Sequence, residues 1–349
     1  MQPSKVFKYL AGYSIPLTAF LSIYLHGLYS FLTPVFAFGF LPFIELIIPV
    51  NKKNLSVVEE ELAKNDKIYD WILYLHMPVQ YGILSYFLYT ITNVQLAGYE
   101  IAGLILSMGT CCGVIGINVA HELGHRKAKS AQCLAKMLLL TSLYMHFIIE
   151  HNKGHHKNVS TEADPSSARL NEPLYLFYFR TIFGTMRSAW EIQLKELHQD
   201  KKSFFSLQNE MLIFQFVQIS FLILIFFIFN LKALICFIPA AFVGILLLEA
   251  VNYIEHYGLR RNKTANNMYE RVQPWHSWNS DHVIGRVVLY ELTRHSDHHY
   301  SASRKYQILR HSDEAHQLPA GYPAMILLAL IPPVYFKIMN PMISKIQQQ

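Results

Sequence analysis

Residues 98–125 read GYEIAGLILSMGTCCGVIGINVAHELGH, an apolar run that leads directly into two histidines. About 20 apolar residues are needed for a helix to cross the hydrocarbon core of a bilayer, and Gly98–Ala120 carries one charged residue, Glu100. His121 and His125 are four residues apart, so they lie on one face of a continuing helix. The stretch therefore predicts a membrane helix that presents two imidazoles at the membrane surface.

The composition of the whole chain is also that of a membrane protein. Of its 349 residues, 52% are hydrophobic and 15% are charged, whereas soluble domains carry about 25% charged residues. Six apolar runs predict membrane crossings: Val6–His26, Leu28–Val50, Ile72–Thr92, Gly98–Ala120, Met211–Phe229 and Leu231–Val251. We expect three antiparallel pairs with tight turns at HGLYS, TNVQLAGYE and FNLKA, which places both termini on the same side.

The predicted fold class is an all-α integral membrane protein with six transmembrane helices and a cytoplasmic histidine domain. Four helices occupy 1–120, a cytoplasmic segment follows over 121–209, two helices occupy 210–251, and a second cytoplasmic segment covers 252–349. Nearly all Lys and Arg fall in the polar segments and only Lys232 lies in an opposite-side turn, so the positive-inside rule places the termini in the cytoplasm. This bias accounts for the net charge of +6, and we expect no nucleic-acid binding.

Four short clusters contain the chemistry-bearing residues: HELGH, EHNKGHH, NYIEHYG and RHSDHH. They supply nine candidate metal ligands: His121, His125, His151, His155, His156, His256, His295, His298 and His299. Helical spacing predicts that His121 shares a centre with His125, that His151 shares one with His155, and that His295 shares one with His298 or His299. Three clusters adjoin apolar runs, so we expect the site at the cytoplasmic mouth of the bundle.

The number of histidines indicates the kind of metal centre. Imidazole suits zinc, copper, iron and nickel, so ligand type alone does not choose the metal. Nine imidazoles exceed what one tetrahedral ion uses and fit two centres of four or five ligands with positions open for O2, which favours two irons. HELGH alone also fits a zinc protease with Glu122 as general base, but that leaves most histidines unused. A metal transporter would place its ligands along the membrane midplane.

Carboxylates near the clusters are candidates for orienting the ligands, because a ligating histidine commonly donates its second N–H to a carboxylate. We expect this role for Glu122, Glu150, Asp164, Glu255 and Asp297, and favour Asp297 because it lies between two candidate ligands. The four cysteines show no C-x-x-C spacing, so any electron-carrying iron–sulfur cluster must arrive on a partner.

The motifs HELGHRK, EHNKGHHKNVSTEADPSSAR, NYIEHYGLRR, HSWNSDH and RHSDHH resemble, in this order and spacing, the membrane alkane 1-monooxygenase (alkane hydroxylase) family over about Gly39–Pro341. The resemblance implies a six-helix bacterial inner-membrane protein whose nine histidines hold two irons, and O2-dependent hydroxylation of the terminal methyl of an n-alkane. Fatty acyl desaturases and hydroxylases and methyl-arene monooxygenases share these boxes and remain the alternatives. His276 and His282 of HSWNSDH match a family motif and are expected beside the metal without binding it.

The resemblance also implies an electron donor, a rubredoxin reduced by an NADH-dependent rubredoxin reductase. Rubredoxins are acidic, so basic residues beside the boxes would steer the donor to its docking site. The candidates are Arg126, Lys127, Lys129, Arg260, Arg261, Lys263, Arg304, Lys305 and Arg310.

An alkane offers no polar group, so its binding must come from burial, about 0.8 kcal/mol per methylene. We expect an apolar tunnel among the membrane helices that alkane enters from the surrounding lipid. Candidate lining residues are Tyr81, Tyr86, Phe87 and Tyr89 on the third helix and Phe36, Phe38 and Phe40 on the second. Ala37 and Gly39 are small enough to leave room for long chains.

Overall fold

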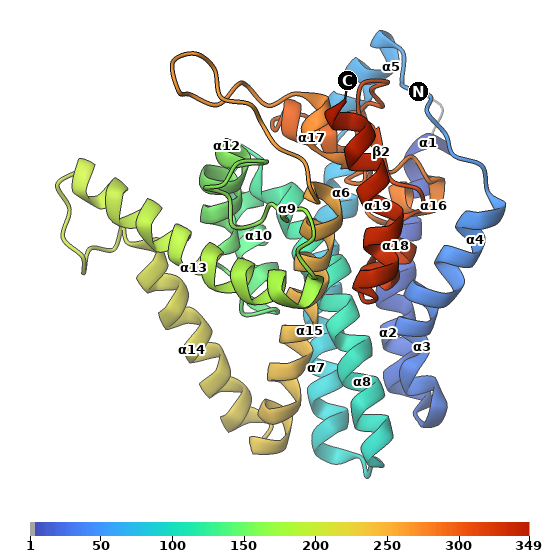
Figure 1. Ribbon diagram of the computed structural model, residues 1–349. Helices are drawn as coiled ribbons and strands as arrows, with labels where there is room; N and C mark the ends of the chain where they lie inside the picture. Colours follow the sequence, from blue (N-terminus) through green and yellow to red (C-terminus); the bar gives the residue numbers. More distant parts are fainter. Residues whose placement is uncertain (1–3, 349) are drawn as a thin grey trace.

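The computed structural model describes residues 4–348 and is mostly helical (Figure 1). The first part of the chain forms α1 (Ser4–Phe7), η1 (Lys8–Tyr13), α2 (Ser14–Leu25), η2 (Gly27–Phe31), α3 (Leu32–Val35), η3 (Phe36–Phe40), α4 (Leu41–Ile47), α5 (Val57–Asn65), α6 (Ile68–Tyr74), α7 (His76–Asn93), α8 (Gly98–Cys111), η4 (Cys112–Ile117), α9 (Asn118–Gly124) and α10 (Lys129–Leu140). The remainder forms α11 (Phe147–Ile149), η5 (Glu150–His155), α12 (His156–Asn158), α13 (Leu174–Gln199), α14 (Glu210–Ile228), α15 (Leu231–His256), η6 (Pro274–His276), β1 (Trp278–Asn279), α16 (Val283–Val288), α17 (His295–Tyr300), η7 (Tyr306–Ile308), β2 (His316–Gln317), α18 (Tyr322–Ala329) and α19 (Pro332–Gln347). Strands β1 and β2 pair in parallel, Trp278 opposite His316 and Asn279 opposite Gln317.

Five helical stretches are long and apolar enough to cross a membrane: Lys5–Leu25, Gly27–Ile47, Gly98–Gly124, Glu210–Ile228 and Leu231–His256. Helices suit this environment because every backbone polar group is satisfied within the segment. The predicted all-α membrane fold is therefore confirmed, and five of the six predicted crossings correspond to these stretches.

The third predicted crossing, Ile72–Thr92, is less apolar than the others and is built from α6 and α7. Its polar residues His76 and Gln80 are fully buried. His76 contacts the hydroxyl of Tyr290, and the Gln80 amide lies 3.2 Å from the hydroxyl of Thr141. Helix α7 packs beside α8 and α15 in the bundle (Figure 1). Its polar side chains thus face protein partners and not lipid.

Two spans continue beyond the predicted limits at Ala120 and Val251 and carry histidines on their last turns. They approach closely because the contact contains glycines. A Cβ on Gly109 would lie 2.5 Å from the Cβ of Val243, and a Cβ on Gly244 would lie 2.9 Å from the Cβ of Cys112. Small residues permit this close packing of membrane helices, which sets the distance between two of the histidine clusters.

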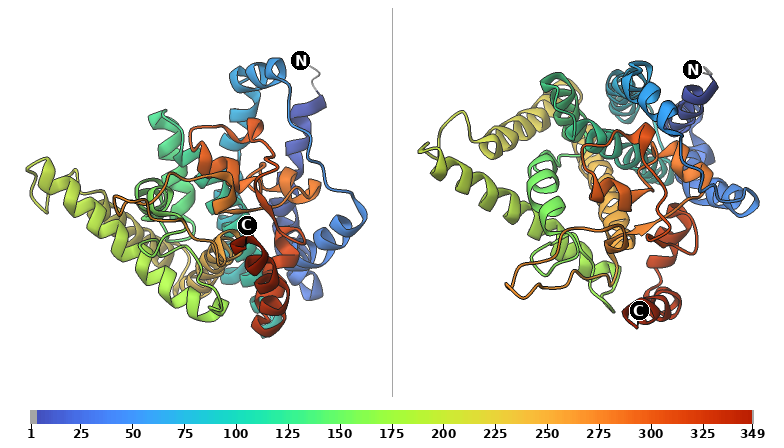
Figure 2. Two further views of the ribbon diagram at one scale, coloured as in Figure 1. Left: turned by 45° about the horizontal axis from the view of Figure 1, so that its top comes forward. Right: turned by 90° about the horizontal axis from the view of Figure 1, so that it is seen from above.

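The polar segments gather at one end of the bundle, where both ends of the described chain also lie (Figure 1). Seen from above, α17 lies over the middle of the molecule (Figure 2). Part of the C-terminal segment, assigned from the sequence to the polar domain, is apolar and returns to the bundle. Helix α18 packs against α15, and the chain then bends by 119° into α19.

Candidate metal centre and its cavity

Nine histidines meet at the polar end of the bundle in two groups. The five-histidine group consists of His121, His125, His151, His156 and His298, and the four-histidine group consists of His155, His256, His295 and His299. Within each group, one nitrogen atom from every ring lies within 4.8 Å of the others. The structure thus brings together all nine residues that the sequence clusters singled out, from segments far apart in the chain.

The division between the groups differs from the prediction based on helical spacing. His151 and His155 were expected to share a centre, but His151 joins His156 in one group while His155 belongs to the other. The reason is local: Glu150–His155 is a π-helix, in which hydrogen bonds run from residue i to i+5. This turn brings the Nε2 atoms of His151 and His156 to 3.0 Å.

The histidines of RHSDHH are also divided between the groups, although α17 is an ordinary α-helix. His298 lies with its Nε2 atom 2.9 Å from that of His121 in the five-histidine group. His295 and His299, on the same short helix α17, join the four-histidine group, where His295 Nε2 lies 3.1 Å from His256 Nε2. One helix therefore serves both groups, as η5 and α12 together do.

The residues present fit two bound metal ions. Two ring nitrogens that bind one ion at about 2.1 Å with perpendicular bonds lie about 3 Å apart, which matches the separations within both groups. Burial, followed by neighbouring imidazoles, lowers the pKa of His151, His298 and His299 well below the usual value. These rings are therefore neutral, the form that binds metal. His155 Nε2 and both nitrogens of His299 are buried without a hydrogen-bond partner among the described residues.

Two of the five predicted carboxylates contact candidate ligands, both in the four-histidine group. Asp164 Oδ2 lies 2.9 Å from His155 Nδ1 and accepts a hydrogen bond from the Ser167 hydroxyl at 2.5 Å. Burial alone would lower the pKa of His155, but Asp164, together with the nearby carboxylates of Glu150 and Glu255, outweighs it and raises that pKa. Glu255 Oε1 lies 3.2 Å from His295 Nδ1 and accepts a hydrogen bond from Tyr322 Oη at 2.7 Å.

The other three carboxylates have different partners, so the expectation that they orient histidines is corrected. Glu122 Oε1 lies 2.6 Å from Arg126 and accepts the N–H of Tyr306 at 3.2 Å. Glu150 Oε1 accepts from the hydroxyl of Ser188 at 3.2 Å, and burial raises the pKa of Glu150 to about 8.

Asp297, the favoured candidate, is bound by arginines. Its carboxylate accepts from the Arg304 guanidinium at 2.5 and 2.7 Å and from the backbone N–H of Arg310 at 2.8 Å. Successive residues of a helix point in different directions, so adjacency to His298 in the sequence does not place Asp297 on the ligand face of α17.

His276 and His282 lie outside both groups. His276 Nδ1 accepts the N–H of Gln273 at 2.9 Å, and its Nε2 lies 3.3 Å from Glu270. His282 Nδ1 lies 3.0 Å from the hydroxyl of Ser280.

Several of the nine basic residues near the boxes are engaged within the chain. Arg304 pairs with Asp297, Arg310 with Glu60, Lys305 with Asp70 and Arg126 with Glu122, while Arg261 donates to the carbonyl of Glu270. Exposed residues without an ion pair in the described part of the chain are Lys127, Lys129, Arg260 and Lys263. The exposed charge beside the site is therefore smaller than the sequence suggests.

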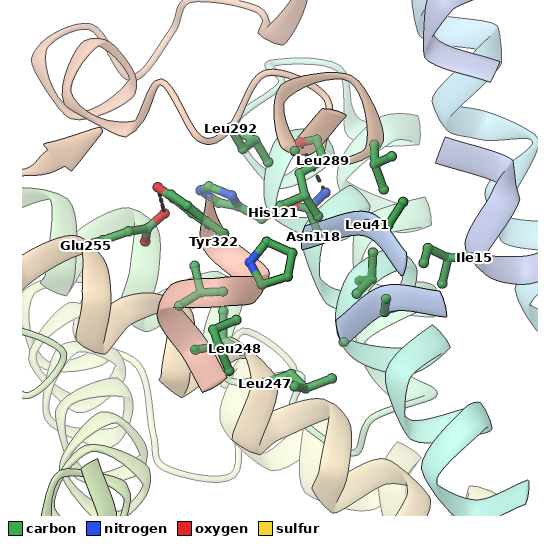
Figure 3. A pocket seen from close by; sticks show the side chains of 18 of the residues that line it. Ile15, Leu41, Asn118, His121, Leu247, Leu248, Glu255, Leu289, Leu292 and Tyr322 are labelled. Atoms are coloured by element: carbon green, nitrogen blue, oxygen red, sulfur yellow. Dashed lines mark hydrogen bonds between the residues drawn. The ribbon is translucent and has the colours of Figure 1, made fainter. Parts of the chain in front are cut away.

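A largely apolar cavity opens beside the histidines (Figure 3). His121 and His151 of the five-histidine group and His295 of the four-histidine group line it. In Figure 3, Leu289 and Leu292 lie above it and Leu247 and Leu248 below it. Its walls also include residues of α2, α4, η4, α16 and α18.

The lining agrees only in part with the sequence-based expectation. Phe38 and Ala37 line the cavity, but Phe36, Phe40 and the aromatic residues of α7 do not. Tyr81 donates to the carbonyl of Met137, and Tyr86 lines a separate groove between α2 and α7. The contribution of α18 was missed, although the apolar stretch YPAMILLALIPP marks it in the sequence.

Comparison with known proteins agrees with this architecture. The fatty acid desaturase family model matches residues 98–328. An alkane 1-monooxygenase of Acinetobacter baylyi is 38% identical over 88% of this chain and 75% of its own length, and one of Pseudomonas putida is 35% identical over 87% and 75%. The xylene/toluene monooxygenase hydroxylase component of Pseudomonas putida is 26% identical over 76% of this chain and 72% of its own length. The chain therefore belongs to the alkane 1-monooxygenase family, within the wider fatty acid desaturase superfamily.

Proposed function

We propose that this chain hydroxylates the terminal methyl group of n-alkanes, using O2 and two irons held by the nine histidines. The observation that carries the proposal is the apolar cavity whose wall includes imidazoles from both groups, His121 and His151 from one and His295 from the other. The names of the relatives, alkane 1-monooxygenases, support the substrate class.

The residues of the chain would bind and orient the substrate. Burial of each methylene against side chains such as Leu247, Leu248 and Val251 contributes about 0.8 kcal/mol. The histidines line only part of the cavity wall, so the end of an extended alkane is the portion that reaches them. This arrangement favours hydroxylation at the terminal methyl. Asp164 and Glu255 would hold the rings of His155 and His295 in place. Bound iron would supply the activation of O2, which no side chain provides.

Electrons would come from a rubredoxin, reduced by an NADH-dependent rubredoxin reductase. Supporting this, Lys127 directly follows HELGHR, Lys129 lies two residues further on, and both are exposed, so an acidic donor would meet positive charge beside the five-histidine group. The concentration of Lys and Arg at the polar end supports a cytoplasmic orientation in a bacterial inner membrane, with alkane entering from the membrane lipids.

Two related activities are the alternatives. The similarity to a xylene/toluene monooxygenase component favours testing methyl-arenes, and the fatty acid desaturase model favours testing fatty acyl chains. The products separate them, because a desaturase forms an internal double bond and no alcohol.

The test uses the full-length protein in lipid with iron, a rubredoxin, its reductase and NADH. Mixed n-alkanes, xylene and fatty acids are supplied together, and products are identified by gas chromatography with mass spectrometry. Primary alcohols from alkanes are the expected result. Modified fatty acid or benzylic alcohol with untouched alkane would overturn the proposal in favour of the corresponding relative.

A further inference from the structure

Two carboxylates line the largely apolar cavity: Glu255, which contacts His295, and Glu45, on the side formed by α4. Glu45 lines the cavity and is only 6% exposed. Leu41, one helical turn earlier, lines it too and lies on the side away from Glu255 in Figure 3. A cavity that held only hydrocarbon would gain nothing from an acidic group in its wall.

The protein uses only one of the two oxygens of this carboxylate. Glu45 Oε1 accepts the N–H of Gly285 at 2.8 Å. Glu45 Oε2 is buried and has no hydrogen-bond partner among residues 4–348. A buried polar atom left unsatisfied costs about 1–3 kcal/mol, and more when it is charged. A ligand that donates a hydrogen bond to Oε2 would recover that free energy.

Two glycines make room for the carboxylate. A Cβ on Gly321 would overlap Oε2, and a Cβ on Gly285 would lie 2.9 Å from Oε1. Gly321 directly precedes α18 and Gly285 lies within α16, and both helices contribute to the cavity wall. The carboxylate therefore occupies a space that side chains at these two positions would fill.

The chemistry of the site selects one kind of group. A fatty acid would bring a second carboxylate toward Glu45 and be repelled. An ammonium group would need several acceptors in a dry cavity, where an unpaired charge is costly. A hydroxyl group needs a single acceptor for its proton, and its alkyl chain suits the remaining apolar walls.

We propose that Glu45 Oε2 binds the hydroxyl of primary alcohols of alkane length, so that their methyl end lies at the histidines and they are converted to α,ω-diols. This inference rests on the proposed function. In the added step a methyl C–H bond breaks and a C–O bond forms, with one atom of O2 entering the new hydroxyl. The other leaves as water, using two electrons from the rubredoxin and two protons from solvent. The hydroxyl at Glu45 is unchanged.

The test compares an n-alkane with the 1-alkanol of equal chain length, each supplied separately to the complete reconstituted system. The expected result is a diol from the alcohol. Glu45→Leu should lower the ratio of kcat/KM for alcohol to kcat/KM for alkane about tenfold or more, the effect of losing one buried hydrogen bond. Glu45→Gln, which keeps a hydrogen-bonding side chain, should restore most of that ratio.

A matched control is Glu100→Leu. Glu100 also accepts a glycine N–H, from Gly27 at 2.6 Å, but does not line the cavity. This variant should leave the ratio unchanged. Iron content of every variant shows whether the bundle has folded.

Binding gives a readout that does not depend on turnover. The 1-alkanol should raise the Tm of the unsubstituted protein and of Glu45→Gln more than that of Glu45→Leu. This inference would be overturned if alkane were hydroxylated but no diol formed from the alcohol. It would also be overturned if Glu45→Leu showed the same ratio of kcat/KM values and the same Tm shift as the unsubstituted protein. Either result would leave the proposed function intact. Absence of alkane hydroxylation alongside a Glu45-dependent Tm shift would instead overturn the proposed function.

Discussion

At the scale of single residues, the partner of each carboxylate decides its role near the histidines. Asp164 and Glu255 lie against His155 and His295, while Asp297 is held by Arg304 and Arg310 although it is adjacent to His298 in sequence. Carboxylates that contact the ring N–H of a ligand fix its orientation and increase its basicity. Only the first two are therefore expected to influence metal binding directly.

Asp164→Asn tests this difference, because it removes the charge at nearly constant size. Losing such a partner lowers metal affinity about 10–100-fold, so the four-histidine group should release its ion first. Iron per protein, measured by mass spectrometry during dialysis against a chelator, should fall from two toward one. Asp297→Asn is the control and should retain both ions as well as the unsubstituted protein does. Equal loss of iron from both variants would contradict the conclusion that Asp164, and not Asp297, supports a metal-binding histidine.

Glu291 connects the polar end to the first membrane span. Its carboxylate lies 2.8 Å from Lys8 and 2.6 Å from Arg286 and accepts from Tyr9 Oη at 2.9 Å. Burial alone would raise the pKa of Glu291, but Lys8 and Arg286 outweigh it and lower that pKa to about 2. The carboxylate therefore stabilises the fold in its ionised form.

The sign of the resulting pH dependence follows from proton linkage. Between the ordinary pKa of a glutamate and about 2, the unfolded chain binds more protons than the folded chain at this residue, so stability falls as pH decreases through that interval. Glu291→Gln should lower Tm at pH 7 and lose less Tm on acidification than the unsubstituted protein. Thermal unfolding at several pH values measures this. The control is Asp313→Asn, at an exposed side chain, which should show the same change of Tm with pH as the unsubstituted protein. If Glu291→Gln lowered Tm by the same amount at every pH, the proposed role of Glu291 in the pH dependence would be refuted.

At the scale of elements, two local irregularities position the histidines. The π-helix η5 moves His155 out of register with His151, so that one short segment supplies both groups. The contact between α8–η4 and α15 is close because Gly109 and Gly244 have no side chain. The first helix continues into the turn that carries His121 and the second ends at His256. The distance between the two helices therefore sets the distance between these two histidine clusters.

Gly109→Ala should therefore destabilise the bundle, since its Cβ would meet Val243 at 2.5 Å. Overpacking of this kind costs about 1–3 kcal/mol, which a decrease in Tm in lipid or detergent would report, together with lower iron content. Gly82→Ala is the matched control because a Cβ there meets nothing within 4 Å, and its effect should stay within about 0.5 kcal/mol. A similar loss from both variants would mean that the close contact is not the cause.

At the scale of the whole molecule, the cavity joins parts of the chain that no local pattern connects. Residues of α2, α4, α15, α16 and α18 form its wall together with His121, His151 and His295. Its apolar surface and its position beside both histidine groups arise only when these elements pack together. The range of alkane lengths accepted should therefore depend on side chains that point inward.

Ala37 and Gly39 offer a test of that statement, because both are small and only Ala37 lines the cavity. Ala37→Phe should fill part of the volume and shorten the longest n-alkane that is hydroxylated, measured by gas chromatography on a series of chain lengths. Gly39→Phe, at an exposed position, should leave the series unchanged. If Gly39→Phe shortened the longest alkane that is hydroxylated, or if Ala37→Phe left it unchanged, the conclusion that Ala37 and not Gly39 lines the substrate cavity would be wrong.

The amino-acid sequence alone determined the membrane class, five of the crossings and the nine histidines that meet, because apolar length and residue spacing are local properties of the chain. Tertiary structure alone decided which histidines share a group, since a π turn separates His151 from His155. It also decided that Asp164 and Glu255 reach the rings while Asp297 does not, and that α18 and Glu45 enter the cavity wall. These outcomes depend on the directions of side chains and on contacts between distant segments, which spacing along the chain does not specify.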